Sequence, residues 1–231
     1  MCKSISHVNA LMVGAYANSI IKDIQKNYTG KNPRAKADAR ATLARLRRSG
    51  TSAYSPWMDI GQQMFSNWPE DKLGDPREDS YAIRAIQATL QLYAFHQQSQ
   101  SSPMAAVIDK GSAEEQRQKY RYATFGAACR RVNLELDSSQ GIRRRLESVY
   151  AASDFDGIVR NIRALIALIK SGKQSDVDKQ IDYGQLGLDL FLMQFEDDRK
   201  KVFFRWGRDY FYLPTGSKSL TSKPSQNKDA K

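Results

Sequence analysis

Apolar residues recur at intervals of three and four along almost the whole 231-residue chain, and this spacing constrains the fold more than any other feature. It places apolar side chains on one face of an α-helix, whereas a half-buried β-strand needs strict alternation. The clearest examples are residues 5–28, 75–97 and 153–172. No segment alternates convincingly, so the sequence predicts an all-α protein.

The helical segments fall into two groups on either side of the polar stretch LELDSSQG. We therefore predict two small helical bundles joined by a short linker. Residues 1–135 form the N-terminal helical domain, with a long loop at residues 98–112, and residues 136–213 form a C-terminal four-helix domain. Residues 214–231 contain lysines and serines but no apolar face, which predicts a disordered basic tail.

The segment KNPRAKADARATLARLRRSG, residues 31–50, carries seven basic residues and one acid, Asp38. At the helical period Ala35, Ala39, Leu43 and Leu46 form one stripe, which predicts a helix over residues 33–49 anchored on its neighbours. The basic side chains flank this stripe, with Lys36, Arg40 and Arg47 on one side and Arg34, Arg45 and Arg48 on the other. Charged helices normally alternate in sign, and this one does not, so its arginines lack local partners.

Most of the chain's positive charge is concentrated in two places. The formal net charge is +11, of which residues 31–48 contribute +6 and the last eighteen residues +3. Such concentration favours a polyanionic partner, first of all nucleic acid, over the alternative that the arginines decorate a solvated face or pair with distant acids. There is no zinc finger, zipper or aromatic RNA-binding motif, so we predict a surface that follows phosphates without reading bases.

Few residues in the chain are suited to metal or redox chemistry. His7 and His96 each lack a second His or Cys at ligand spacing, and we interpret them as surface or helix-end residues. Cys2 and Cys129 make no disulfide framework, and Cys129 is predicted to lie in the core. We expect no cofactor. No stretch has the length of a membrane span or the features of a signal peptide, which predicts a cytoplasmic protein with no membrane partner.

The grouped aspartates all lie near predicted helix starts, where capping explains them. They are Asp154, Asp156, Asp176, Asp178, Asp182, Asp197 and Asp198. We therefore do not predict an enzyme. The alternative in the enzyme class is a metal-dependent nuclease on a helical scaffold, which would need these carboxylates to converge on metal ions. A third interpretation, binding to an anionic membrane surface, is weakened by the aromatic-poor stripe of the basic helix.

Three stretches, ARATLARLRRSG, FGAACRRV and IRRRLESVYAASDFDGIVRNIRALIALIKSGKQSDVDKQIDYGQLGLDL, resemble the CasB (Cse-two) family in their order and spacing. That family is the small subunit of the type I-E CRISPR complex Cascade, an RNA-guided antiviral complex. The resemblance covers most of residues 33–213. It implies a non-catalytic, all-helical protein, present as two copies, that contacts the crRNA-coating backbone subunits and the large subunit.

The resemblance also implies that basic surfaces of this protein bind target DNA, both the displaced non-target strand and the target strand, to stabilise the R-loop. At matching positions the candidates are Arg34, Arg40, Arg45, Arg47, Arg48, Arg130, Arg131, Arg143 and Arg144, and the charge pattern adds Lys36.

Overall fold

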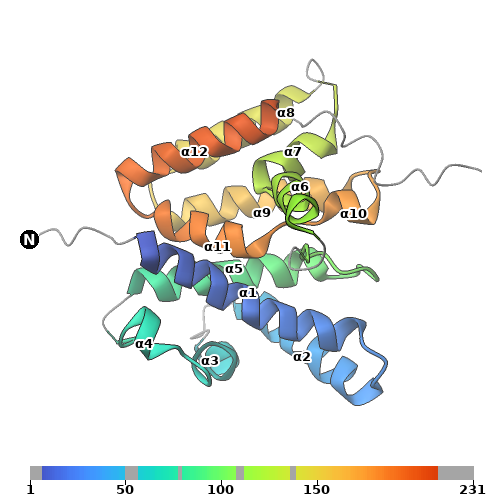
Figure 1. Ribbon diagram of the computed structural model, residues 1–231, viewed down its shortest axis with the longest axis vertical. Coiled ribbons are helices and arrows are strands. Elements are labelled where there is room, and N and C mark those ends of the chain that lie inside the picture. Colours follow the sequence, from blue (N-terminus) through green and yellow to red (C-terminus); the bar gives the residue numbers. More distant parts are fainter. Residues whose placement is uncertain (1–6, 50–56, 78–79, 108–111, 136–138, 213–231) are drawn as a thin grey trace, which may run out of the picture.

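The computed structural model describes residues 7–49, 57–77, 80–107, 112–135 and 139–212. These residues form twelve helices, labelled in Figure 1. The first six are α1 (His7–Thr29), α2 (Pro33–Ser49), α3 (Trp57–Phe65), α4 (Glu70–Leu73), α5 (Ser80–Gln97) and α6 (Ala113–Ala123). The others are α7 (Phe125–Val132), α8 (Gln140–Tyr150), α9 (Phe155–Ser171), α10 (Asp176–Lys179), α11 (Tyr183–Leu192) and α12 (Glu196–Phe211). The predicted tail at 214–231 lies outside the described residues.

The all-α prediction is confirmed. Over the part of the chain that the structure describes, the one departure from helices and turns is an isolated parallel bridge between Ala105 and Ile181. The expected basic helix is α2, and the four helices expected in the C-terminal part are α8, α9, α11 and α12, with the short α10 inserted before α11.

Helix α11 joins the two parts of the chain, because it packs against both α1 and α5 (Figure 1). The approach to α1 is close: a Cβ atom added to Gly14 would lie 2.3 Å from the carbonyl oxygen of Gly184. Only glycine fits at such a distance. The fully buried Ile21 and Leu186 belong to the same core.

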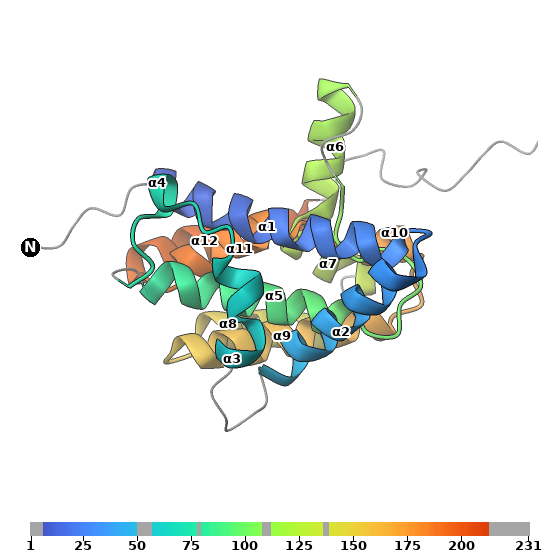
Figure 2. The same cartoon turned by 90° about the horizontal axis from the view of Figure 1, so that it is seen from below.

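The remaining helices lie on either side of this centre. Helix α2 packs against α1 and α5, while α7 packs against α12 and α8 packs against α9. Helix α6 stands out from the body of the molecule, as Figure 2 shows. It begins with a capping box, in which Ser112 and Glu115 each bind the other's backbone N–H group.

Helices from both sides of the predicted division at residues 135 and 136 pack against one another. One hydrophobic cluster contains buried residues from both sides of it, such as Ile86 and Leu190. Helix α7, which precedes the division, packs against α9 and α12, which follow it. The polar stretch at 134–141 therefore connects helices that share one core, and two separate bundles stay a prediction.

Part of the predicted loop at residues 98–112 is tightly held. Met104 and Ala105 are buried, and the Gln25 side chain binds both the N–H and the carbonyl oxygen of Ala105 at 3.0 Å. Gln97 accepts a hydrogen bond from the Met104 N–H at 3.0 Å. Buried glutamine side chains from α1 and α5 thus satisfy backbone groups that have no helical partner.

Candidate nucleic-acid interface

Helix α2 is anchored as its pattern predicted. Asn32 caps it, because its side-chain oxygen accepts hydrogen bonds from the N–H groups of Arg34 and Ala35. Pro33 then occupies the first helical position, where a missing N–H costs nothing. The buried residues are Ala39, Leu43, Leu46 and Ser49. They face α1, α3 and α5, which leaves the basic flanks toward solvent.

Five basic side chains of α2 have no ion pair within the described part of the fold. Arg34, Arg40 and Arg48 are exposed, and Lys36, Arg45 and Arg47 are half-buried. Among the described residues, no carboxylate lies within ion-pair distance of Arg34, Lys36, Arg40, Arg45 or Arg47. Arg45 instead donates a hydrogen bond to the Thr42 hydroxyl at 3.1 Å. These five side chains therefore present positive charge that no described carboxylate compensates.

Two residues of α9 extend this positive surface around Phe95 of α5. The guanidinium carbon of Arg163 lies 3.9 Å from the centre of the Phe95 ring, and Lys170 Nζ lies 5.1 Å from it. Lys170 also donates a hydrogen bond to the Phe95 carbonyl oxygen at 3.1 Å. Helix α5 packs between α2 and α9, so the three helices carry one basic face. We call Arg47, Arg163 and Lys170 the Phe95 cluster.

The cations of the Phe95 cluster repel one another. Burial lowers the pKa of Lys170, and the positive charges of Arg47 and Arg163 lower it further. Burial also lowers the pKa of Arg47 and of Arg163. An anion bound at this face would reverse the repulsion, because an opposite charge a few ångströms away favours the charged form of each group.

Sequence reasoning missed Arg163 and Lys170. Both lie on a helix that the apolar pattern of residues 153–172 predicted, seven residues apart and therefore on one face. That spacing was visible in the sequence. What the sequence did not show is that α5 brings this face of α9 next to α2.

Arg143 and Arg144 form a separate basic group. They lie on α8, which packs against α9, and Arg144 is exposed while Arg143 is half-buried. For Arg144 no ion pair occurs among the residues described. Both remain candidates for phosphate contacts.

The predicted role of Arg130 and Arg131 needs correction, because the structure buries both side chains. Arg131 donates to three backbone carbonyl oxygens, those of Tyr122, Asp178 (2.7 Å) and Gln180 (3.1 Å). Its guanidinium carbon also lies 4.2 Å from the centre of the Tyr122 ring. These carbonyl groups end α6 and α10 and have no partner within their own helices.

Arg130 is held in a similar way at the end of its own helix. It donates to the carbonyl oxygens of Asn133 (2.8 Å) and Leu134, just after α7 ends. Both arginines are therefore occupied by the fold, and we exclude them from the candidate interface.

His96 lies in the last turn of α5, as the helix-end interpretation expected, but it is not at the surface. It is fully buried, and its Nδ1 atom lies 3.0 Å from the Tyr183 hydroxyl. Burial and the nearby charges of Lys170 and Lys179 lower the pKa of His96 to about 3. It is a neutral core residue. The side chain of His7 lies outside the described part of the structure, while Cys129 is buried in the core as predicted.

The aspartates do not converge. Asp154 caps α9 by accepting a hydrogen bond from Gly157 N–H at 2.6 Å, and Asp182 caps α11 by accepting one from Gln185 N–H at 3.0 Å. Both aspartates lie at helix starts, as predicted, and each caps its helix. Within the described ranges, no three His, Cys, Asp or Glu residues are grouped so that they could hold a metal ion. The nuclease alternative therefore gains no support.

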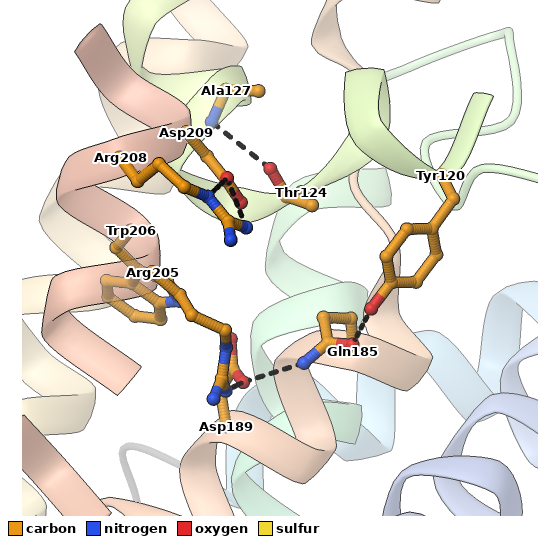
Figure 3. Close-up of polar contacts among 9 residues, drawn as sticks. All are labelled: Tyr120, Thr124, Ala127, Gln185, Asp189, Arg205, Trp206, Arg208 and Asp209. Atoms are coloured by element: carbon orange, nitrogen blue, oxygen red, sulfur yellow. Dashed lines mark hydrogen bonds and ion pairs between the residues drawn. The ribbon is translucent and has the colours of Figure 1, made fainter. Parts of the chain in front are cut away.

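Asp189 of α11, which is 2% exposed, is used structurally (Figure 3). Its carboxylate accepts hydrogen bonds from Trp206 Nε1 at 2.6 Å, Arg205 Nη2 at 2.5 Å and Gln185 Nε2 at 2.8 Å. Gln185 in turn accepts a hydrogen bond from the Tyr120 hydroxyl of α6. This network fixes α12 and α6 to α11. In the described segments, no helix is both long and apolar enough to span a bilayer.

Comparisons with known proteins agree with this geometry. The family model described as CRISPR-associated protein Cse2 matches residues 42–211. The crystal structure of CasB from Thermobifida fusca is similar, with a TM-score of 0.62 and 25% identity, over 87% of this chain and 98% of that one. The crystal structure of M. ruber CasB gives a TM-score of 0.55 at 21% identity, over 85% and 92% of the two chains, and supports the fold alone. A comparison with curated proteins gives no match.

Proposed function

Since the chain belongs to the CRISPR-associated Cse2 family, whose members are small structural subunits of the Cascade complex, we propose that its α2–α9 basic face stabilises the R-loop by binding DNA strands without sequence specificity. The observation that carries this proposal is the Phe95 cluster. Arg163 and Lys170 of α9 lie over the Phe95 ring, Arg47 of α2 is near enough for its charge to lower the pKa of Lys170, and none of the three has an ion pair in the described residues.

The energetics of the R-loop make such a surface useful. A guide–target heteroduplex is about as stable as the DNA duplex it replaces, so backbone contacts made by protein can tip the exchange. Guanidinium and ammonium groups that repel one another are stabilised in their charged forms by each phosphate that approaches them. The proposed ligands are the displaced strand and the target strand, whose sequence is read by base pairing and not by this subunit.

We expect the protein to act inside an assembly. Its proposed partners are the crRNA-coating backbone subunits, the large subunit and a second copy of the chain. The other exposed and half-buried basic groups of α2, at Arg34, Lys36, Arg40, Arg45 and Arg48, would then add phosphate contacts beside the Phe95 cluster, and Arg143 and Arg144 of α8 would add contacts of their own.

The test is a triple substitution, Arg47→Gln, Arg163→Gln and Lys170→Gln. Binding of the purified protein to single-stranded DNA should weaken, and the slope of log affinity against log salt should become shallower by about 0.7 for each phosphate that the variant no longer neutralises. In the assembled complex, the R-loop lifetime on a matched DNA target should shorten. Thermal unfolding of the variant shows whether the fold is retained.

A matched control removes two lysines that are already paired. Lys200 lies 3.8 Å from Glu196 and Lys201 lies 2.8 Å from Asp198. The Lys200→Gln and Lys201→Gln variant should keep the wild-type salt slope. An unchanged slope and R-loop lifetime in the folded triple variant would exclude the α2–α9 face as the DNA-binding surface.

A further inference from the structure

An apolar notch lies between α8 and α12, on surface that the proposed DNA contacts of α2 and α9 do not use. Its apolar lining consists of Leu146, Phe203, Trp206, Gly207, Tyr210 and Phe211. The volume is about 110 Å³. Since an apolar cavity of about 150 Å³ holds a benzene molecule, this notch can accept one large apolar side chain.

Gly207 is the residue that keeps the notch open. It lies inside α12, where glycine is destabilising by roughly 0.5–1 kcal/mol relative to alanine. Close packing explains other glycines of this chain, such as Gly126, whose added Cβ would lie 2.3 Å from the Trp206 carbonyl oxygen. At Gly207 nothing lies within 4 Å of an added Cβ. The fold itself therefore gives no steric reason for glycine at this position.

Aromatic side chains surround the notch and remain partly uncovered. Phe211 is 60% exposed, although it packs edge-on against Tyr210 with ring centres 5.1 Å apart. Phe203 packs against the exposed ring of Tyr150, with ring centres 4.9 Å apart. Aromatic residues that are exposed around an apolar pocket are typical of protein interfaces, where they act as anchors.

The polar groups around the notch indicate what a partner should carry. Arg143 lines it and is followed by the exposed Arg144 and Arg145, whereas Glu147 is the acidic residue among those lining it. Tyr210 is buried, and its hydroxyl has no hydrogen-bond partner within the described part of the chain. The charged side chains at the rim, and not this buried hydroxyl, therefore indicate which partner fits.

From these observations we propose that the α8–α12 notch docks another protein subunit of the complex, through one large apolar side chain flanked by carboxylates. The proposal rests on the proposed function only in that it requires the chain to work as a subunit. The net positive charge of Arg143, Arg144 and Arg145 against Glu147 complements the acidic flanks. Gly207 leaves the space that the apolar side chain enters.

The experiment fills the notch without disturbing the fold. Tagged Gly207→Leu protein is co-expressed with the other Cascade subunits and a guide RNA, and the subunits that co-purify are quantified. We expect its association with one neighbouring subunit to weaken at least about tenfold, as for the loss of an interface hot spot. The melting temperature should be unchanged or higher, because leucine forms helices better than glycine.

The matched control is Gly61→Leu. Gly61 also lies inside a helix, α3, and an added Cβ would meet only the end of the Phe65 ring, at 3.9 Å. This variant should assemble like the wild type. A photo-crosslinking amino acid at Phe211 should then attach the chain to the same neighbouring subunit, at a segment with acidic residues.

Three results would overturn the proposal: normal assembly of the Gly207→Leu protein, an equal loss in the Gly61→Leu control, or a crosslink from position 211 to nucleic acid or to a second copy of this chain. Binding of the purified Gly207→Leu protein to single-stranded DNA should match the wild type. Failure of the docking proposal can thus be distinguished from failure of the proposed DNA-binding function, which the Phe95 cluster variant tests.

Discussion

The arginine pairs in LRRSG and in CRRV look alike in sequence, and Arg47 of the first and Arg131 of the second have opposite environments. Both pairs end a helix, α2 and α7, next to its apolar stripe. Arg131 is buried against the carbonyl ends of two other helices, whereas Arg47 has no hydrogen bond or ion pair among the described residues. The difference shows that an arginine at a helix end becomes structural where unpaired carbonyl groups converge on it, as at Arg131, and remains available to a ligand where they do not, as at Arg47.

The largest effect is expected from a substitution in the buried pair, at Arg131. Arg131→Met should lower the free energy of unfolding by about 3 kcal/mol, because three carbonyl groups lose their donor in the interior. Urea denaturation measures this change. The control Arg121→Met removes an exposed arginine from the last turn of α6 and should be nearly neutral. Equal stabilities of the two variants would show that the burial of Arg131 is not what holds α6 and α10 in place.

The buried His96 should make the stability of the protein depend on pH. His96 has an ordinary pKa near 6.5 in the unfolded chain and a pKa of about 3 in the folded protein, because burial disfavours its charged form. The unfolded state therefore binds the proton first as the pH falls. The contribution of His96 to stability is present above pH 6.5 and is lost as the pH falls toward 3.

Between pH 7 and pH 5 this loss should be about 2 kcal/mol, and it should disappear in a His96→Gln variant. Urea denaturation at a series of pH values measures it. His7→Gln is the matched control, since it removes the chain's other histidine, and it should keep the wild-type pH dependence. The same pH dependence in the His96→Gln variant would contradict a neutral, buried imidazole.

The helical periodicity predicted the fold class and the position of α2, because those depend on local spacing. The caps at Asp154 and Asp182 were predictable for the same reason, since their hydrogen bonds reach only three residues along the chain. The burial and the hydrogen-bond partners of Arg131 and His96 were not predictable. Arg131 binds carbonyl groups up to 49 residues away, and Tyr183, which binds His96, is 87 residues away.

The candidate site divides in the same way. The charge of α2 was visible in one short segment, whereas the Phe95 cluster combines residues of α2 and α9 beside a ring of α5, and these three helices are distant in sequence. Apolar spacing predicted all three helices and could not predict their neighbours. For the same reason the polar stretch at 134–141 suggested a domain boundary, although the core continues across it.

The smallest expected effect concerns α2, the helix that carries Arg47. There the informative result is whether a substitution raises or lowers the free energy of unfolding. Lys36 and Arg40 are four residues apart on α2, and like charges at that spacing destabilise a helix by a few tenths of a kcal/mol. Arg40→Gln should therefore make the protein slightly more stable at low salt. The gain should vanish at high salt, where surface charges are screened. Urea denaturation at both salt concentrations measures it.

The mirror control is Lys200→Gln, which removes the partner of Glu196 four residues earlier on α12 and should make the protein slightly less stable at low salt. If Arg40→Gln instead destabilises the protein to a similar extent, α2 must have an acidic partner, and the contrast with α7 disappears. If the Arg40→Gln variant is more stable and also binds single-stranded DNA more weakly, the charge of Arg40 destabilises the fold and contributes to DNA binding. No solvated face that exists only for solubility would combine those two effects.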